Sequence, residues 1–204
     1  MKRILITGFE PFGGESINPS WEVVCRLPDV IGEYELTRLC LPVVFGDAAN
    51  MLLDLAAELM PDVILCIGQA GGRSAITPEM VAINLRHADI PDNLGNQPRD
   101  EKIVFGGETA YFSTVPVRKM AESINAMGIS SCVSYSAGAY VCNDLLYTLL
   151  NHYTNSKVSV GFIHIPYCLE QGKEPSMSIE SMTAATIAAQ RSLCEDNEAV
   201  SINN

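Results

Sequence analysis

The sequence predicts an α/β fold: a single domain with a mainly parallel, twisted sheet and helices on both faces. Short apolar runs alternate with amphipathic segments along all 204 residues, with 48% apolar and 18% charged residues. Buried strands joined by helical crossovers favour a parallel sheet that is covered on both sides. No linker, repeat or low-complexity tract interrupts the pattern. We therefore expect one domain over residues 1–204, with a frayed tail at about 196–204.

Apolar runs bounded by turn-forming residues predict the strands. The stretch 91–113 is rich in turn formers and holds only short strand candidates. The expected strands are residues 2–8, 34–43, 61–68, 79–90, 130–138 and 157–166.

Capping signals and helical spacing of apolar residues predict five helices. Asn18 and Pro19 are typical of an N-cap and a first helical residue. Pro116 begins another helix, and Gly128 ends it. The expected helices are residues 19–27, 46–60, 116–127, 139–150 and 176–194.

The charge of the chain restricts its partners. A formal net charge of -11 disfavours nucleic acid and anionic membranes, because both repel an acidic surface. The apolar run behind the basic start covers only residues 4–6, far short of a signal peptide. No stretch approaches the roughly 20 apolar residues of a membrane span. We expect a soluble, cytoplasmic protein.

One cysteine stands apart from the others. No pair has the C-x-x-C spacing of a zinc or redox motif, and a free cysteine is commonly a small buried hydrophobe. Cys142, however, falls in the opening turn of a predicted helix. Unpaired N–H groups and the helix dipole stabilise a thiolate there, so we expect a lowered pKa and a nucleophile. The seven cysteines are Cys25, Cys40, Cys66, Cys132, Cys142, Cys168 and Cys194.

A cysteine nucleophile needs a base, and the chain offers three histidines. His164 ends a predicted buried strand, where it is either this base or a satisfied core residue. His152 lies at the far end of the Cys142 helix, about 15 Å away by helical rise. His87 lies in a polar loop. Spacing alone does not choose the carboxylate that would orient the imidazole.

Glycine loops suggest phosphate binding as a different class of function. Two loops at the carboxyl ends of predicted strands, "GFEPFGG" and "GQAGGRS", match neither G-x-G-x-x-G nor G-x-x-x-x-G-K-[ST]. The lysine of a P-loop is absent. A nucleotide-binding domain is therefore the weakest hypothesis.

Five motifs together resemble the pyroglutamyl peptidase type I family, also called pyrrolidone-carboxylate peptidases. They are "LITGFEPFGGESINPSWEVV", "GQAGGRSAITPEMVAINL", "IPDNLGNQP", "SAGAYVCN" and "GFIHIPYCLEQ", and they span nearly the whole chain. The resemblance implies a cysteine peptidase that removes N-terminal pyroglutamate (5-oxoproline) from peptides. It also implies a homotetramer that needs no metal or organic cofactor.

The resemblance also assigns roles to residues. It implies Cys142 as nucleophile, His164 as base and Glu79 as the orienting carboxylate. Pyroglutamate is a neutral, flat lactam, which calls for an apolar slot with neutral hydrogen-bond partners. The implied slot residues are Phe9, Phe12, Gln69, Ile90, Tyr140 and Val141.

Two residues depart from the family pattern. Asp89 replaces an arginine, and Asp144 replaces a histidine directly after the "VCN" motif. Carboxylates close to the thiol would oppose thiolate formation, and Arg73 or Arg86 would have to substitute for the missing arginine. A catalytically weakened or inactive pyroglutamyl-binding member of the same fold is therefore the alternative hypothesis.

Overall fold

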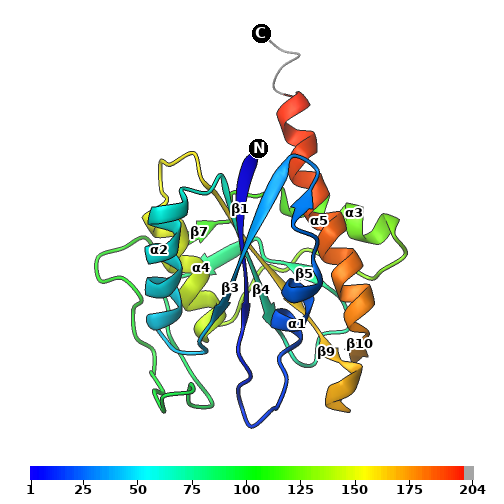
Figure 1. The fold of residues 1–204 in the computed structure, drawn as a ribbon. Coiled ribbons are helices and arrows are strands. Elements are labelled where there is room, and N and C mark those ends of the chain that lie inside the picture. The colour runs from blue at the N-terminus through cyan, green and yellow to red at the C-terminus, as the bar shows by residue number, and fades with distance from the viewer. Residues whose placement is uncertain (200–204) are drawn as a thin grey trace.

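The computed structural model describes residues 1–199, with side chains through Cys194, as one six-stranded sheet between two layers of helices (Figure 1). The four inner strands are parallel, and a short antiparallel strand flanks each edge. The sheet order is β2 (Val30–Ile31), β3 (Tyr34–Leu41), β1 (Lys2–Phe9), β4 (Val63–Gln69), β8 (Ser159–Ile165) and β5 (Thr77–Pro78).

Two small ladders accompany the main sheet. One pairs β6 with β7 in antiparallel orientation, and the other pairs β9 with β10 in parallel orientation. Their bounds are β6 (Val81–Ile83), β7 (Ala110–Phe112), β9 (Tyr167–Cys168) and β10 (Ser176–Met177), with a 3-10 turn at Leu169–Gln171.

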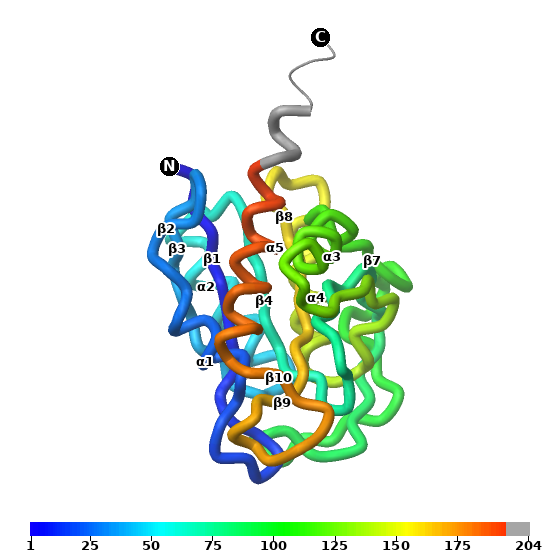
Figure 2. Tube along the Cα trace, turned by 90° about the vertical axis from the view of Figure 1, so that its right-hand side faces the viewer, coloured from blue at the N-terminus to red at the C-terminus, as the bar shows by residue number. Residues whose placement is uncertain are grey.

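Alternating side chains of the inner strands build a separate core on each face of the sheet. Ile4 and Ile6 of β1 pack beneath three helices, whereas Leu5 and Phe9 face the other two. Figures 1 and 2 show the two helical layers on opposite sides of the sheet. The first layer holds α1 (Pro19–Arg26), α3 (Val117–Ala126) and α5 (Ile179–Ala199), and the second holds α2 (Asp47–Leu59) and α4 (Val141–His152). The predicted fold class is confirmed.

Local signals placed several elements correctly. Asn18 caps α1, and its side chain accepts a hydrogen bond from the Ser20 N–H at 3.1 Å. The helix α5 continues through Ala199, so residues 196–199 of the expected tail are helical. Residues 200–204 of that tail lie outside the described residues. Within the described chain, no helix is long and apolar enough to cross a membrane.

The strand predicted at 130–138 is wrong. This segment runs beside residues 76–80 and forms only isolated bridges, Ile76 with Ser131 and Glu79 with Ser134. Proline has no N–H to donate, so a regular ladder is interrupted at Pro78. The Ser134 N–H still donates to the Pro78 oxygen at 2.9 Å, which keeps the segment next to the sheet edge.

The strand predicted over residues 79–90 is much shorter in the structure. Only Val81–Ile83 forms a strand, paired with β7. Beyond it the chain leaves the ladder. The Arg86 N–H donates to the Glu101 oxygen at 2.7 Å and the His87 N–H to the Ala139 oxygen at 2.9 Å.

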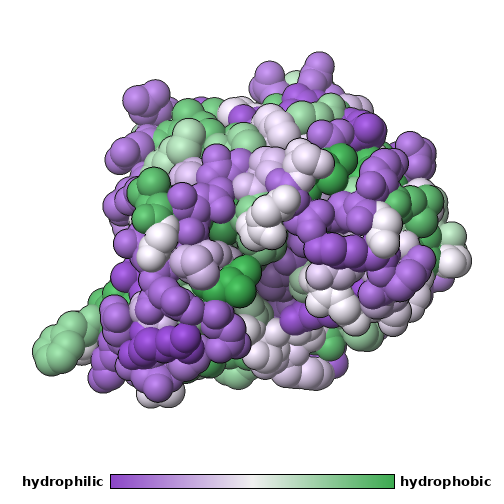
Figure 3. Space-filling view, turned by 90° about the horizontal axis from the view of Figure 1, so that it is seen from below, coloured by the Kyte–Doolittle hydropathy of each residue, from purple (hydrophilic) through white to green (hydrophobic). Residues whose placement is uncertain are grey.

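The carboxyl ends of the parallel strands meet at one end of the molecule, the lower end in Figure 1, where the loop between β1 and α1 also lies. Seen from below, this end is largely hydrophilic, with apolar residues in small separate patches (Figure 3). Loops at this end of a parallel sheet are the usual place for a ligand site.

Gly8 allows α1 to approach the central strand. A Cβ there would lie 2.7 Å from both the N and Cα atoms of Trp21, and backbone atoms cannot move aside as a side chain can. We expect Gly8→Ala to lower the free energy of unfolding by about 1–3 kcal/mol, as overpacking does. The melting temperature should fall by about 2–4 °C for each kcal/mol, measured by calorimetry. An unchanged melting temperature would mean that α1 shifts without cost.

Candidate active site

The pairing of β5 with β8 brings a buried histidine and a buried carboxylate together. His164 lies on β8 opposite Thr77 of β5, and Glu79 follows that edge strand by one residue. The His164 Nδ1 atom is 2.7 Å from Glu79 Oε1, and the Glu79 side chain is 0% exposed. The edge strand therefore delivers the carboxylate to the imidazole.

Arg73 supplies the positive charge that this buried carboxylate requires. Its Nη1 atom donates to Glu79 Oε1 at 2.6 Å and to Thr77 Oγ1 at 2.5 Å, and its Nη2 atom donates to the Ser136 oxygen at 3.0 Å. Burial by itself raises the pKa of Glu79, but its hydrogen bonds with His164 and Arg73, together with the charge of His164, hold it below its ordinary value. Glu79 is therefore ionised and accepts hydrogen bonds only, which places the proton of neutral His164 on Nδ1.

Cys142 is the second residue of α4, as its sequence context predicted. Tyr140 is the N-cap and provides no side-chain cap, so the first N–H groups of the helix remain available to a ligand. A Cβ on Gly68 would lie 3.0 Å from the Cys142 Sγ atom and 2.6 Å from the Phe162 ring. Only glycine leaves room for the thiol at this point of β4.

The thiol and the imidazole lie in the same neighbourhood. Gly68, which the Cys142 thiol contacts, is paired in register with His164. The rings of Phe162 and His164 lie 4.7 Å apart between centroids.

The expected lowering of the Cys142 pKa is wrong. Burial, together with the nearby Glu79 charge, raises the pKa of the Cys142 thiol to about 12. The Arg73 charge and the backbone N–H of Cys142 itself act in the opposite direction but do not offset burial. Burial also lowers the pKa of His164 below its ordinary value, against the pull of Glu79. At neutral pH both shifts favour a neutral thiol beside a neutral imidazole.

A small pocket opens beside the Cys142 thiol. About 280 Å³ of empty space lies within it, open solvent at its mouth included. Five expected slot residues line it, whereas Ile90 does not. Ile90 is exposed, and its Cδ1 atom lies 3.9 Å from where a Cβ on Gly13 would be. The lining residues are Phe9, Phe12, Asn18, Val43, Gln69, Tyr140, Val141 and Cys142.

Sequence reasoning missed Asn18 and Val43 as lining residues. The sequence predicts Asn18 as the N-cap of α1. In the structure Asn18 caps this helix and also lines the pocket. Its amide is held at both ends, because Nδ2 donates to the Glu10 oxygen at 2.9 Å and Oδ1 accepts from Ser20. Val43 follows β3 and carried no chemical signal.

The turn over residues 91–96 joins three walls of the pocket without lining it. The carboxylate of Asp92 accepts the Phe45 N–H at 3.0 Å, and the side chain of Asn93 donates to the Pro11 oxygen at 2.9 Å. The Tyr140 hydroxyl donates to the Pro91 oxygen at 3.0 Å. The "IPDN" motif therefore acts as a bracket between the aromatic loop, the loop after β3 and the start of α4.

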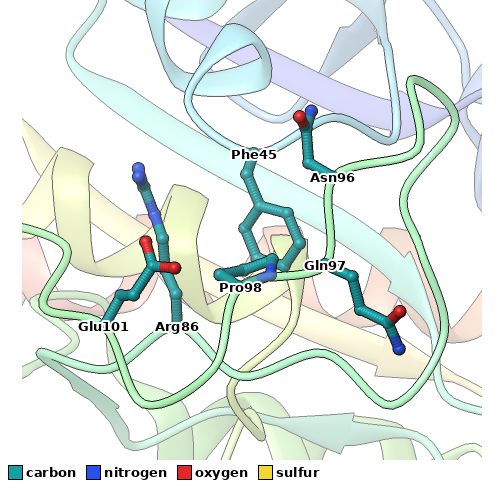
Figure 4. A pocket seen from close by; sticks show the side chains of 6 residues that line it. All are labelled: Phe45, Arg86, Asn96, Gln97, Pro98 and Glu101. Carbon is teal, nitrogen blue, oxygen red and sulfur yellow. The ribbon is translucent and has the colours of Figure 1, made fainter.

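Asp144 does not act on the thiol as expected. Its buried carboxylate accepts Arg86 Nε at 2.5 Å and the Gly46 N–H at 2.8 Å, so its charge is paired. Arg86 lines a second, larger pocket that holds about 680 Å³ of empty space, open solvent included, and Cys142 does not line it (Figure 4). In Figure 4 the Arg86 side chain lies beside Glu101, with the Phe45 ring next to Pro98.

Asp89 also lies away from the thiol. Its side chain is 93% exposed, with Oδ1 3.7 Å from His87 Nε2 and 3.5 Å from Arg99 Nη1. Of the two arginines considered as substitutes for the family arginine, Arg73 is the one that contacts the Glu79–His164 pair.

The remaining histidines lie apart from Glu79. His87 Nδ1 is 2.8 Å from Asp100 Oδ1 in an exposed cluster, and His152 is the last residue of α4, where it contacts Tyr153. Among the described residues, no group of three or more His, Cys, Asp or Glu side chains could hold a metal ion.

The Arg86–Asp144 pair can be tested by its effect on stability. We expect Arg86→Gln to lower the free energy of unfolding by about 3 kcal/mol, because it leaves a buried carboxylate without its cation. Asp144→Asn in the same chain should recover most of that loss in a denaturant titration. As a control, Asp144→Asn should not rescue Arg73→Gln. Equal losses for the single and double Arg86 variants would contradict the pairing.

Comparison with known proteins identifies chains of similar sequence and fold. Pyrrolidone-carboxylate peptidase from Yersinia pestis (strain Pestoides F) is 49% identical over 192 residues, which cover 91% of this chain and 89% of the relative. The crystal structure of Bacillus amyloliquefaciens pyroglutamyl peptidase I is 44% identical, with a TM-score of 0.92 over 96% of this chain and 98% of that one. Pyrrolidone carboxyl peptidase from Thermococcus litoralis is 37% identical, with a TM-score of 0.92 over 98% and 96% of the two chains. The family model described as pyroglutamyl peptidase matches residues 2–195, and the chain therefore belongs to the pyroglutamyl peptidase family.

Proposed function

We propose that this protein removes the N-terminal pyroglutamyl residue from peptides by acyl transfer to Cys142. The observation that carries the proposal is a helix-start thiol on the wall of a small, largely apolar pocket, near a histidine bound to a buried carboxylate. An N-terminal pyroglutamyl group has no ammonium to pair. A slot with aromatic walls and two uncharged amides suits it better than an acidic site would.

In the proposed reaction, His164 is the base and Glu79 fixes its orientation. Glu79 engages Nδ1, which leaves Nε2 to take the proton of the Cys142 thiol as sulfur attacks the pyroglutamyl carbonyl. The imidazolium then gives this proton to the leaving amine. Water hydrolyses the thioester and releases free pyroglutamate.

The pKa shifts favour proton transfer during attack over a thiolate formed in advance. The raised pKa of Cys142 and the lowered pKa of His164 both oppose a resting thiolate–imidazolium pair. The N–H groups at the start of α4 are suited to stabilise the oxyanion that develops on the carbonyl oxygen. Arg73 favours the anionic sulfur in the same region.

An inactive binding protein is supported less well. That alternative rested on Asp89 and Asp144, and both carboxylates have cationic partners away from the thiol. The implied homotetramer and the cytoplasmic location stay proposals.

Cleavage of a pyroglutamyl-coumarin amide tests the function directly. We expect the wild-type protein to release the fluorophore and to leave the prolyl-coumarin amide intact. Cys142→Ser should lose at least about a thousandfold in kcat/KM, because removing a nucleophile disables the whole catalytic unit. Cys132→Ser, which changes an exposed thiol, is the matched control and should keep full activity. Comparable activity in the two variants would refute the nucleophile.

The pH profile tests the protonation states. If neutral His164 is the base, kcat/KM should fall as pH drops through the His164 pKa, which lies below 6.5. Above that point the rate should stay level through neutral pH, because the Cys142 thiol holds its proton until far more alkaline conditions. Steady-state rates between pH 4 and 10 would measure both the acidic fall in kcat/KM and the level region above it. A rate that rises through pH 8 to 9 would instead indicate a requirement for preformed thiolate.

A further inference from the structure

Gln69 is the lining residue with an unused polar group. It ends β4 beside Cys142, and among the described residues no hydrogen bond uses its NH2 group. The amide of Asn18 is occupied on both ends, and the Tyr140 hydroxyl donates away from the pocket to Pro91. Of the two amides that line the pocket, Gln69 is therefore the one whose NH2 group is wholly free for a ligand.

Gln171 determines which end of that amide faces the ligand. The backbone N–H of Cys168 donates to one terminal atom of Gln171 at 3.0 Å, and since a backbone N–H can only donate, this atom is the oxygen Oε1. The other terminal atom, Nε2, lies 2.9 Å from Gln69 Oε1 and 3.4 Å from the Ile17 carbonyl oxygen. A carbonyl oxygen only accepts, so the polarity of Gln171 is fixed from both sides.

The fixed orientation of the Gln171 amide in turn fixes the orientation of the Gln69 amide. Its oxygen is held by Gln171 outside the pocket, and its NH2 remains for the ligand. We propose that Gln171 is a positioning residue that makes Gln69 a hydrogen-bond donor to the lactam carbonyl oxygen, not an acceptor for the lactam N–H. This inference rests on the proposed function and adds which polar group of the lactam ring the Gln69 side chain binds.

This orientation predicts discrimination against proline. A prolyl residue has the same ring size but carries CH₂ where pyroglutamate has its ring carbonyl. It would leave the Gln69 NH2 without an acceptor and would bring an ammonium group into an apolar slot. A site that loses a buried hydrogen bond rejects the analogue more strongly than shape alone would.

A double-mutant cycle on the wild-type background tests whether Gln171 acts through Gln69. We expect Gln171→Leu and Gln69→Leu each to lower kcat/KM for the pyroglutamyl-coumarin amide by about tenfold, the range of one hydrogen bond. In the Gln69→Leu background, Gln171→Leu should then have little further effect, less than about twofold. Glu170→Gln, an exposed change on the same 3-10 turn, is the matched control. Additive effects would overturn the inference.

A second variant changes polarity with little change in shape. In Gln171→Glu the carboxylate still accepts the Cys168 N–H but cannot donate to Gln69. Gln69 would then turn its NH2 toward the carboxylate and its oxygen toward the lactam oxygen. We expect a larger loss of kcat/KM than in Gln171→Leu, and a melting temperature somewhat below that of the wild type, because the new carboxylate would also face the Glu15 carboxylate and the Ile17 oxygen. Wild-type kcat/KM in Gln171→Glu would overturn the inference.

A thiolactam substrate, in which sulfur replaces the ring carbonyl oxygen, reports on the same bond because sulfur is the poorer acceptor. Wild type should prefer the oxygen substrate, and this preference should shrink in both Leu variants. An unchanged preference would make Gln171 merely structural and overturn the inference alone. If the wild-type protein cleaves neither substrate, the proposed function fails and the inference fails with it.

Discussion

The candidate site depends on the buried negative charge of Glu79. A carboxylate without solvent exposure is stable only when cations and donors surround it. His164 approaches it from β8, and Arg73 approaches from the loop after β4. Because Arg73 also binds Thr77 and the Ser136 oxygen, the same charge fixes the edge strand and the segment that leads into α4. The buried charge of Glu79 thus orients His164 and also holds the neighbouring segments in place.

That constraint also explains the resting chemistry. Water is largely excluded around Glu79 and His164, and the thiol is shielded with them, so charge separation across the site is costly. The helix start at Cys142 is a real source of positive potential, but its contribution is smaller than the desolvation of sulfur. In the proposed reaction, the site would therefore stabilise charge as it develops during attack on the carbonyl, not in the free protein.

Apolar periodicity and capping signals were sufficient to predict the sheet and its two helical layers, because they indicate which faces of the helices and strands are buried. They failed at residues 130–138, where Pro78 of a distant segment interrupts the pairing, and no local pattern in 130–138 reports that. The position of Cys142 was readable from a turn followed by a helix, whereas its pKa was not, since burial is a tertiary property. From the sequence, the Asp144 carboxylate is expected to oppose formation of the Cys142 thiolate. Its pairing with Arg86 depends on the fold and has no local sequence pattern. Gln171 carried no signal without the contact to Gln69.

The bracket formed by residues 91–96 has a consequence for ligand affinity. A five-membered lactam has few atoms, so it can bind well only if each atom contributes strongly and little is lost to ordering the protein. By joining the aromatic loop, the Phe45 loop and Tyr140 through hydrogen bonds, the bracket orders these walls before any ligand arrives. A pocket whose walls are ordered in this way accepts a narrow range of ligands but binds each ligand atom well. It suits one small rigid ring and would resist widening for bulkier N-terminal groups.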